Sequence, residues 1–324
     1  MEYILNNSKV PTTNGFKINN VKVDLDIPEL NKDILEIDTN MSINQEYINN
    51  KINSLINLEL DEYLNIDIKS KTNDNYLKFN IDNNKCTKLN LDLENDNNIV
   101  IKLNKDIFNY LILNINNKDN TNITILNYLN KDSNNLLAIE GNNQGNLNLN
   151  VIDLGSNVTV NNIDVINNKE SAKTSINNIF IGIDNNLIDY NYYITNKSEL
   201  TNIDINVQGV LKDTAKSNFK GIIDFISGAK KSIGNEIENV ILLSEDAKSK
   251  SMPVLLCGEE DVQGSHGVST GKLDKEKIFY LMSRGLSESD AKRVLIKSNF
   301  NKVLSNINDE DIINEIDNYI DEII

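Results

Sequence analysis

Residues 89–103 read Leu-Asn-Leu-Asp-Leu-Glu-Asn-Asp-Asn-Asn-Ile-Val-Ile-Lys-Leu, and this stretch decides the fold. Leucines alternate with polar residues up to Leu93, a polar run follows, and the alternation resumes at Ile99. An apolar period of two is typical of a β-strand with one buried face. Similar segments recur about every 11 to 13 residues along the middle of the chain, with polar turns between them. The sequence therefore predicts a ladder of short strands.

About a dozen short strands without helices between them are compatible with a sandwich, a barrel or a β-solenoid. The spacing fits a solenoid with two strands in each coil of about 22 to 26 residues, although no strict repeat is present. Asparagine supplies 60 of the 324 residues. It tolerates left-handed turns, and its side-chain amides can stack between successive coils. These properties favour the solenoid.

The charge and cysteine content exclude several classes of protein. The chain carries 48 acidic against 32 basic residues, for a formal net charge of −16, which disfavours non-specific binding to nucleic acid. Two distant cysteines cannot by themselves build a disulfide framework or a four-thiolate site. No apolar run has the length of a membrane span, and the first residues lack the pattern of a signal peptide. We therefore expect a soluble, cytoplasmic protein.

The two ends of the chain differ from the strand ladder. Residues 1–75 mix strand-like and helix-like pieces, with a helix expected over Asn44–Leu58, and the solenoid is expected over residues 76–268. Residues 269–324 are expected to form a C-terminal helical region.

Three helices are expected in that C-terminal region. The first spans Lys275–Arg284, with Asp274 as its N-cap and Gly285 as its stop signal. Ser287–Asp290 resembles the capping box that opens a second helix, and a third, acidic helix begins at about Asn308.

Asparagine is absent from residues 240–298, and that same window contains the single histidine, both arginines and Cys257. The window contains the segments Leu242–Ala247, Pro253, Glu260–Gly267, Gly271–Asp274 and Ile278–Leu286. Together these segments resemble the C-terminal core of the SufB/SufD family, the scaffold proteins of Suf-type iron–sulfur cluster assembly. The chain is similar to the compact single scaffold of minimal Suf systems.

The resemblance implies a mainly β fold, a right-handed parallel β-helix with terminal helical regions. It also implies a non-enzymatic scaffold that binds a transient iron–sulfur cluster at a homodimer interface and works with a SufC-like ABC ATPase. A complex of two scaffold and two ATPase subunits is expected. The chain contains no GxxxxGK[ST] loop, so we expect no nucleotide to bind to it.

The resemblance also implies candidate ligands for iron or the cluster. His266 matches the histidine that family members use as a proposed cluster ligand, and Glu238 occupies the position of the cysteine of SufB. Gly264 replaces a cysteine of SufD, while Ser265 and Gly267 replace acidic residues of SufB. Two copies of Glu238 and His266 would form a mixed oxygen and nitrogen site, suited to ferrous iron or a labile cluster.

The C-terminal helices carry the expected partner surface. Phe279, Tyr280 and Arg284 are candidates for contact with the ATPase, and the apolar residues among them can also pack on the scaffold. A simpler interpretation makes these helices a cap over the open end of the solenoid. Cys257 lies in an apolar run and is expected to be a buried free cysteine, and Cys86 is expected to be incidental.

Two other functions stay open at this level. The chain could be a structural solenoid for protein interaction without a cluster site, because glycines flank the histidine motif. It could also be a carbohydrate-active β-helix enzyme with paired carboxylates. The low aromatic content of 6% and the absence of tryptophan argue against that enzyme.

Overall fold

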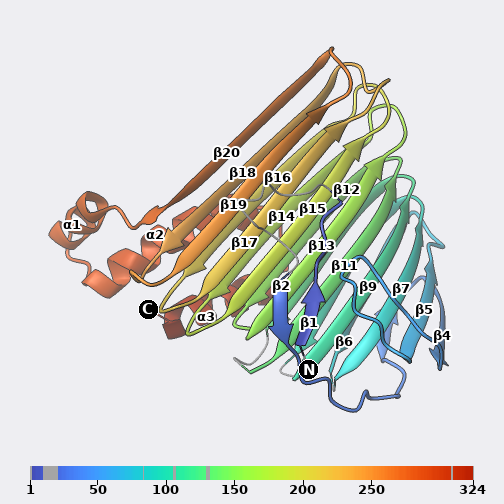
Figure 1. Cartoon of the computed structure of the whole chain (residues 1–324), viewed down its shortest axis with the longest axis horizontal. Helices are drawn as coiled ribbons and strands as arrows, with labels where there is room; N and C mark the ends of the chain where they lie inside the picture. Colours follow the sequence, from blue (N-terminus) through green and yellow to red (C-terminus); the bar gives the residue numbers. More distant parts are fainter. Residues whose placement is uncertain are drawn as a thin grey trace.

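The computed structural model describes residues 2–9, 21–82, 84–104, 107–128, 132–307 and 309–323. Two nine-stranded sheets dominate it, and from β5 onward successive strands of the chain alternate between them (Figure 1). Sheet I has the strand order β19-β17-β15-β13-β11-β9-β7-β5-β4, and sheet II has the order β20-β18-β16-β14-β12-β10-β8-β6-β3. From β5 and β6 onward, every pairing within a sheet is parallel. This arrangement confirms the predicted β-solenoid with two strands in each coil.

In the described part of the chain the solenoid has eight coils, and each coil has one strand in sheet I and one in sheet II. The strands of sheet I in these pairs are β5 (Tyr63–Lys69), β7 (Lys85–Leu93), β9 (Phe108–Asn117), β11 (Asn134–Asn143), β13 (Val158–Asn167), β15 (Leu187–Asn196), β17 (Lys216–Phe225) and β19 (Lys248–Cys257). Those of sheet II are β6 (Asp74–Ile81), β8 (Asp96–Asn104), β10 (Asn120–Tyr128), β12 (Asn146–Leu154), β14 (Lys173–Gly182), β16 (Asn202–Leu211), β18 (Ser232–Leu242) and β20 (Val262–Lys272).

The coils lengthen along the chain. Leu64 pairs with Thr87, 23 residues later, whereas Lys216 pairs with Lys248, 32 residues later. The predicted length of 22 to 26 residues therefore holds for the early coils only. Between the two sheets, alternate side chains form one continuous apolar core that includes Leu89, Ile163 and Phe219. Burial of each such side chain contributes about 1.5 to 3 kcal/mol.

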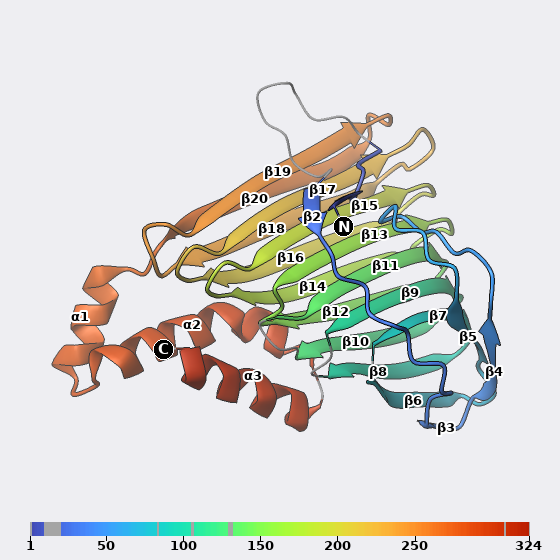
Figure 2. The same ribbon diagram turned by 60° about the horizontal axis from the view of Figure 1, so that its bottom comes forward.

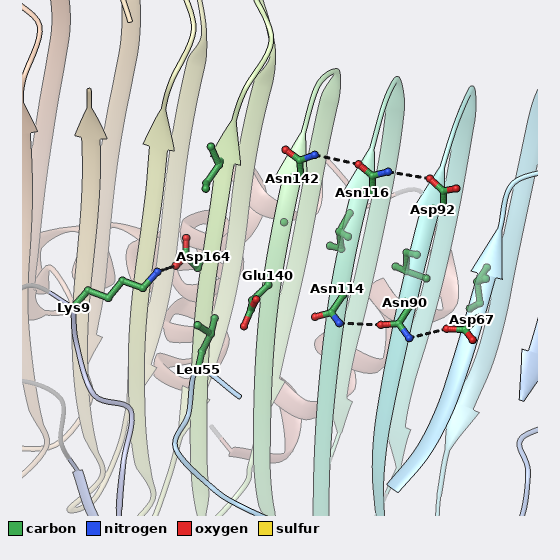
Figure 3. Close-up of a pocket in the computed structure, with 15 residues that line it drawn as sticks. Lys9, Leu55, Asp67, Asn90, Asp92, Asn114, Asn116, Glu140, Asn142 and Asp164 are labelled. Atoms are coloured by element: carbon green, nitrogen blue, oxygen red, sulfur yellow. Dashed lines mark hydrogen bonds and ion pairs between the residues drawn. The ribbon is translucent and has the colours of Figure 1, made fainter. Parts of the chain in front are cut away.

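Asparagine has both of its predicted roles. Asn57, Asn84 and Asn95 adopt positive φ angles in turns. On the outer face of sheet I, Asn142 donates to Asn116 at 3.2 Å and Asn116 donates to Asp92 at 3.0 Å (Figure 3). Ladders of this kind satisfy polar side chains and fix the register between coils.

The N-terminal region covers the outer face of sheet I. Its strands are β1 (Glu2–Leu5), β2 (Val21–Asp24), β3 (Ile37–Thr39) and β4 (Ser42–Ile48). Strands β1 and β2 pair with each other, and their apolar residues pack against β9, β11 and β13. The helix expected over Asn44–Leu58 is wrong, because β4 pairs antiparallel with β5 and extends sheet I. Ile52 forms an isolated bridge with Leu60.

Three helices follow the solenoid: α1 (Lys275–Ser283), α2 (Glu288–Leu304) and α3 (Glu310–Ile323). Asp274 caps α1, Ser287 caps α2, and Gly285 ends the α1 turn with a φ of 99°. Helices α2 and α3 cover the outer face of sheet II (Figure 2), where Phe300 and Ile316 join an apolar cluster with Ile152. The alternative of a cap over the open end is therefore wrong, because β19 and β20 form that end.

Candidate functional site

Strand β18 places two glutamates inside the solenoid near its C-terminal end. Glu236 and Glu238 have no exposed surface, whereas Ile237 between them is 38% exposed. The side chains of a strand alternate between its two faces, so Glu236 and Glu238 share the inner face. Val240 continues that face and belongs to the apolar core.

Most of the side chains around both carboxyl groups are apolar. None of their four oxygens has a hydrogen bond of good geometry in the described part of the chain, although the Ser251 hydroxyl is near Glu238. Burial raises the pKa of Glu236 to about 8, and the nearby charge of Glu238 adds to this rise. Burial also raises the pKa of Glu238 to about 7, and the nearby Ser251 hydroxyl opposes this rise. Near neutral pH Glu236 therefore favours the protonated form, while Glu238 is about half protonated.

A glycine on the facing strand makes room for Glu236. A Cβ atom at Gly221 of β17 would lie 2.4 Å from the carboxyl carbon of Glu236 and 2.4 Å from each of its oxygens. A side chain at this position would displace the carboxyl group of Glu236. Gly221 therefore forms the cradle in which this carboxyl group lies.

His266 lies on β20, the last strand of sheet II. It pairs in register with Glu236, and Val268 pairs with Glu238. Neighbouring strands are about 4.8 Å apart and paired residues lie on the same face, so His266 follows Glu236 on the same face of sheet II. The last coil, which contains β20, covers Glu236 and Glu238. No described strand follows β20 in sheet II, so His266 is exposed.

One chain does not hold a complete metal site in its described residues. No group of three or more histidine, cysteine, aspartate or glutamate side chains lies close enough there to hold a metal ion. Glu238 and His266 therefore do not form a metal site within one chain, as far as the structure describes it. Glu236 was missed by the sequence analysis, although its two-residue spacing from Glu238 on a predicted strand was the available signal.

The two cysteines have different environments. Cys86 is buried, and burial raises the pKa of its thiol well above the ordinary value. The prediction that Cys257 is buried is wrong, since the residue is exposed at the end of β19. Its strand is the last of sheet I, so no further coil covers the apolar run that suggested burial. Of these two thiols, Cys257 is the one that reagents can reach.

Helix α1 has no buried residue in its nine-residue length. Phe279 is 72% exposed and Tyr280 is 57% exposed. The expected packing of these side chains on the scaffold is therefore wrong. The guanidinium of Arg284 lies 5.3 Å from the centroid of the Tyr280 ring. A groove of about 390 Å³ separates α1 from the end of the solenoid, and it is lined by Leu242, Leu243, Leu273, Ile278, Phe279 and Met282 among others.

Comparison with known proteins decides the family. The family model described as "SUF system FeS cluster assembly, SufBD core domain" matches residues 93–299, which include β18, β20, α1 and most of α2. The chain belongs to the SufBD family. None of the described helices of this SufBD protein is long and apolar enough to cross a membrane.

Curated relatives match shorter parts of this SufBD protein. The iron–sulfur cluster assembly protein SufD of Bacillus subtilis is 41% identical over 88 residues, covering 27% of this chain and 20% of the relative. SufD of Escherichia coli is 29% identical over 143 residues, covering 44% and 34%. An iron–sulfur cluster assembly SufBD family protein of Pyrococcus horikoshii is 35% identical over 82 residues, covering 25% and 18%. These matches span about a third or less of each relative's length.

Proposed function

We propose that this SufBD family protein is a cytoplasmic, non-enzymatic scaffold on which an iron–sulfur cluster is assembled. Two copies hold the nascent cluster between them, with Glu238 and His266 of each copy as ligands. Because Glu238 has no exposed surface, the end of the solenoid must open before this carboxyl group can bind the cluster. A separate SufC-like ABC ATPase docks on the C-terminal helices and drives the scaffold through its cycle. The cluster is the cargo of the protein and passes on to an acceptor.

The observation that carries this proposal is the position of His266 at the open end of the solenoid. The imidazole is exposed on β20, in register with a buried carboxyl group one strand away. Carboxylate and imidazole ligands suit ferrous iron and a labile cluster better than a tightly held one. Since one chain supplies too few ligands, a second copy of the same end completes the site by two-fold symmetry.

The edges of the two sheets support the pairing of two copies. Strands β19 and β20 each have one neighbour in their sheets, and β20 is an 11-residue strand with almost every residue exposed. An exposed edge of this length is a template for pairing with another strand. A dimer formed through these edges would bring two copies of His266 toward one interface.

Helix α1 supports the docking of a partner. Its exposed Phe279 and Met282 line the groove described above, together with charged residues such as Lys272 and Lys292, and its Tyr280 is exposed as well. Aromatic and methionine side chains are enriched at protein interfaces, and arginine often anchors them. Arg284 next to Tyr280 gives this surface such a group.

Anaerobic reconstitution with ferrous iron and sulfide, after co-expression with the ATPase, tests the proposal. The wild type should co-purify with the ATPase and show the visible absorption of a cluster. His266→Ala and Glu238→Ala should keep the ATPase but lose most of the cluster. Glu260→Gln, a change at an exposed acidic residue in the loop before β20, is the matched control. Equal iron and sulfide binding by the wild type and His266→Ala would instead favour a structural solenoid without a cluster site.

A further inference from the structure

The outer face of sheet I carries an open groove that the proposed function does not use (Figure 3). The groove has a volume of about 820 Å³ and crosses the five neighbouring strands β5, β7, β9, β11 and β13. Because neighbouring strands are about 4.8 Å apart, it is about 19 Å long. Two rows of polar side chains border it: a first row of Asp67, Asn90, Asn114, Glu140 and Asp164, and a second row of Asp92, Asn116 and Asn142.

The width of the groove restricts what can lie in it. The two rows are two residues apart on each strand, as Asn114 and Asn116 are on β9, which corresponds to about 7 Å. An α-helix with its side chains is about 10 Å wide or more and does not fit between the rows. An unbranched chain that runs across the strands does fit.

Hydrogen bonds along the first row run in one direction. Asn90 donates to Asp67 at 2.7 Å, and Asn114 donates to Asn90 at 2.9 Å. The side-chain oxygen of Asn114 therefore lies on the side of Glu140, with which Asn114 is in register (Figure 3). Glu140 is exposed, and its carboxylate has no hydrogen bond or ion pair within the described residues. Two acceptors thus face each other at this point, and a donor between them would satisfy both.

A second hollow adjoins the groove at the same point. It has a volume of about 420 Å³ and shares Lys9, Leu55, Glu140 and Asp164 with the groove. Asn191 of β15 lines this hollow, is only 4% exposed, and has a side-chain oxygen without a hydrogen-bond partner in the described part of the chain. Buried polar atoms are nearly always hydrogen-bonded, so this oxygen also needs a donor from outside the described residues.

Lys9 shows which kind of donor this surface accepts. Its ammonium group pairs with Asp164 and lies 5.5 Å from the centroid of the Tyr193 ring. An ammonium group on an unbranched alkyl chain therefore already occupies one end of the groove. Among the residues that line the groove, Lys9 is the one cation against four carboxylates, so a negative charge remains.

We propose that this groove binds an unbranched aliphatic polyamine, with one amino group at Glu140 and another at Asp67. These two residues are three strands apart in the first row, about 14 Å. The amide oxygens along the rows accept hydrogen bonds from the amino groups between the ends. The net charge of −16 on the whole chain raises the local concentration of such a ligand.

Calorimetric titration of the full-length protein with spermine tests the site. The wild type should bind one spermine per chain. Glu140→Gln, which keeps the shape of an exposed side chain, should weaken binding about threefold to fivefold. Glu260→Gln makes the same change of charge elsewhere on the surface and should leave the affinity unchanged. Circular dichroism establishes that each variant is folded.

A second pair of variants changes the affinity in the opposite direction. Lys9→Met removes the competing ammonium group from Asp164 and should tighten spermine binding. Lys169→Met removes an exposed lysine from a turn outside the groove and should have no effect. All four variants should still co-purify with the ATPase and accept a cluster, so the outcome is independent of the proposed function.

Two further probes test the shape of the ligand. The short diamine putrescine cannot span the groove and should bind more weakly than spermine. Acetylated and amidated tetralysine carries the same four positive charges as spermine on a bulkier backbone, and it should also bind more weakly. Equal weakening by Glu140→Gln and Glu260→Gln would show general attraction to an acidic surface and overturn the site. Tighter binding of tetralysine than of spermine would overturn the polyamine and assign the groove to a peptide.

Discussion

Raising the pH from 6 to 9 should destabilise the metal-free protein through Glu236 and Glu238. An unfolded glutamate has a pKa near 4.5, whereas the pKa of Glu236 is about 8 and that of Glu238 is about 7 in the fold. Between these values the folded state holds more protons than the unfolded state, so stability falls as the pH rises. The contribution of each group is complete below pH 4.5 and is lost as the pH passes through its folded pKa.

The size of the effect follows from these pKa values. A change of one in pKa corresponds to about 1.4 kcal/mol. Between pH 6 and pH 9, the contribution of Glu236 to stability falls over about two pH units and that of Glu238 over about one. The free energy of unfolding should therefore fall by about 4 kcal/mol in total. Replacing both residues by glutamine removes the proton linkage, although the buried amides lower stability at every pH.

Urea unfolding in the presence of a chelator, at several pH values, measures this difference. The wild type and Glu260→Gln should show the same steep loss of stability at alkaline pH. Glu236→Gln should show a smaller loss, and the double glutamine variant should show almost none beyond the titration of other groups. If the wild type and the double variant lose stability in parallel, the two carboxyl groups do not lie neutral in the solenoid, and the reasoning fails.

Three further predictions concern the partner surface, the thiols and the asparagine ladder. Phe279→Ala and Tyr280→Ala should each weaken ATPase binding by about 2 kcal/mol, about 30-fold in Kd, with an unchanged melting temperature; an unchanged Kd in calorimetry would remove α1 from the interface. Cys257 should react with an alkylating reagent in the folded state, yet Cys257→Ser should still accept a cluster from iron and free sulfide; a complete loss would show that assembly requires this thiol. Asn143→Ala should lower the unfolding free energy by about 2 to 3 kcal/mol, because it breaks buried hydrogen bonds to Asn117, Asn167 and the backbone. Asn120→Ala, in an exposed ladder, should change it by less than about 0.5 kcal/mol, and equal effects in urea unfolding would contradict this difference.

The sequence was most informative where local pattern and environment agree. Alternation at positions such as Leu89 and Leu91 predicted the solenoid, since every second side chain enters the same core. Local pattern failed over Asn44–Leu58, where a helix was expected. The pairing of β4 with β5, a contact with a later segment, overrides that local preference.

Other features depend on the ends of the solenoid, which local patterns do not reveal. The apolar run before Cys257 resembles that of a buried strand, but its exposure depends on β19 being the last strand of its sheet. Glu236 and Glu238 resemble solvated residues in the sequence, although they occupy the inner face of β18. His266 was found through the family resemblance and not through its surroundings. The sequence therefore located the candidate region, while the structure showed which side chains adjoin one another.

The central claim, a cluster held between two copies of the chain, is tested most directly by anaerobic native mass spectrometry of the reconstituted protein. The account predicts that iron and sulfide appear only in species with two copies of the chain. It also predicts that a dimer of the His266→Ala variant lacks them. A cluster on the single chain, or an unchanged cluster in the His266→Ala dimer, would contradict the shared site.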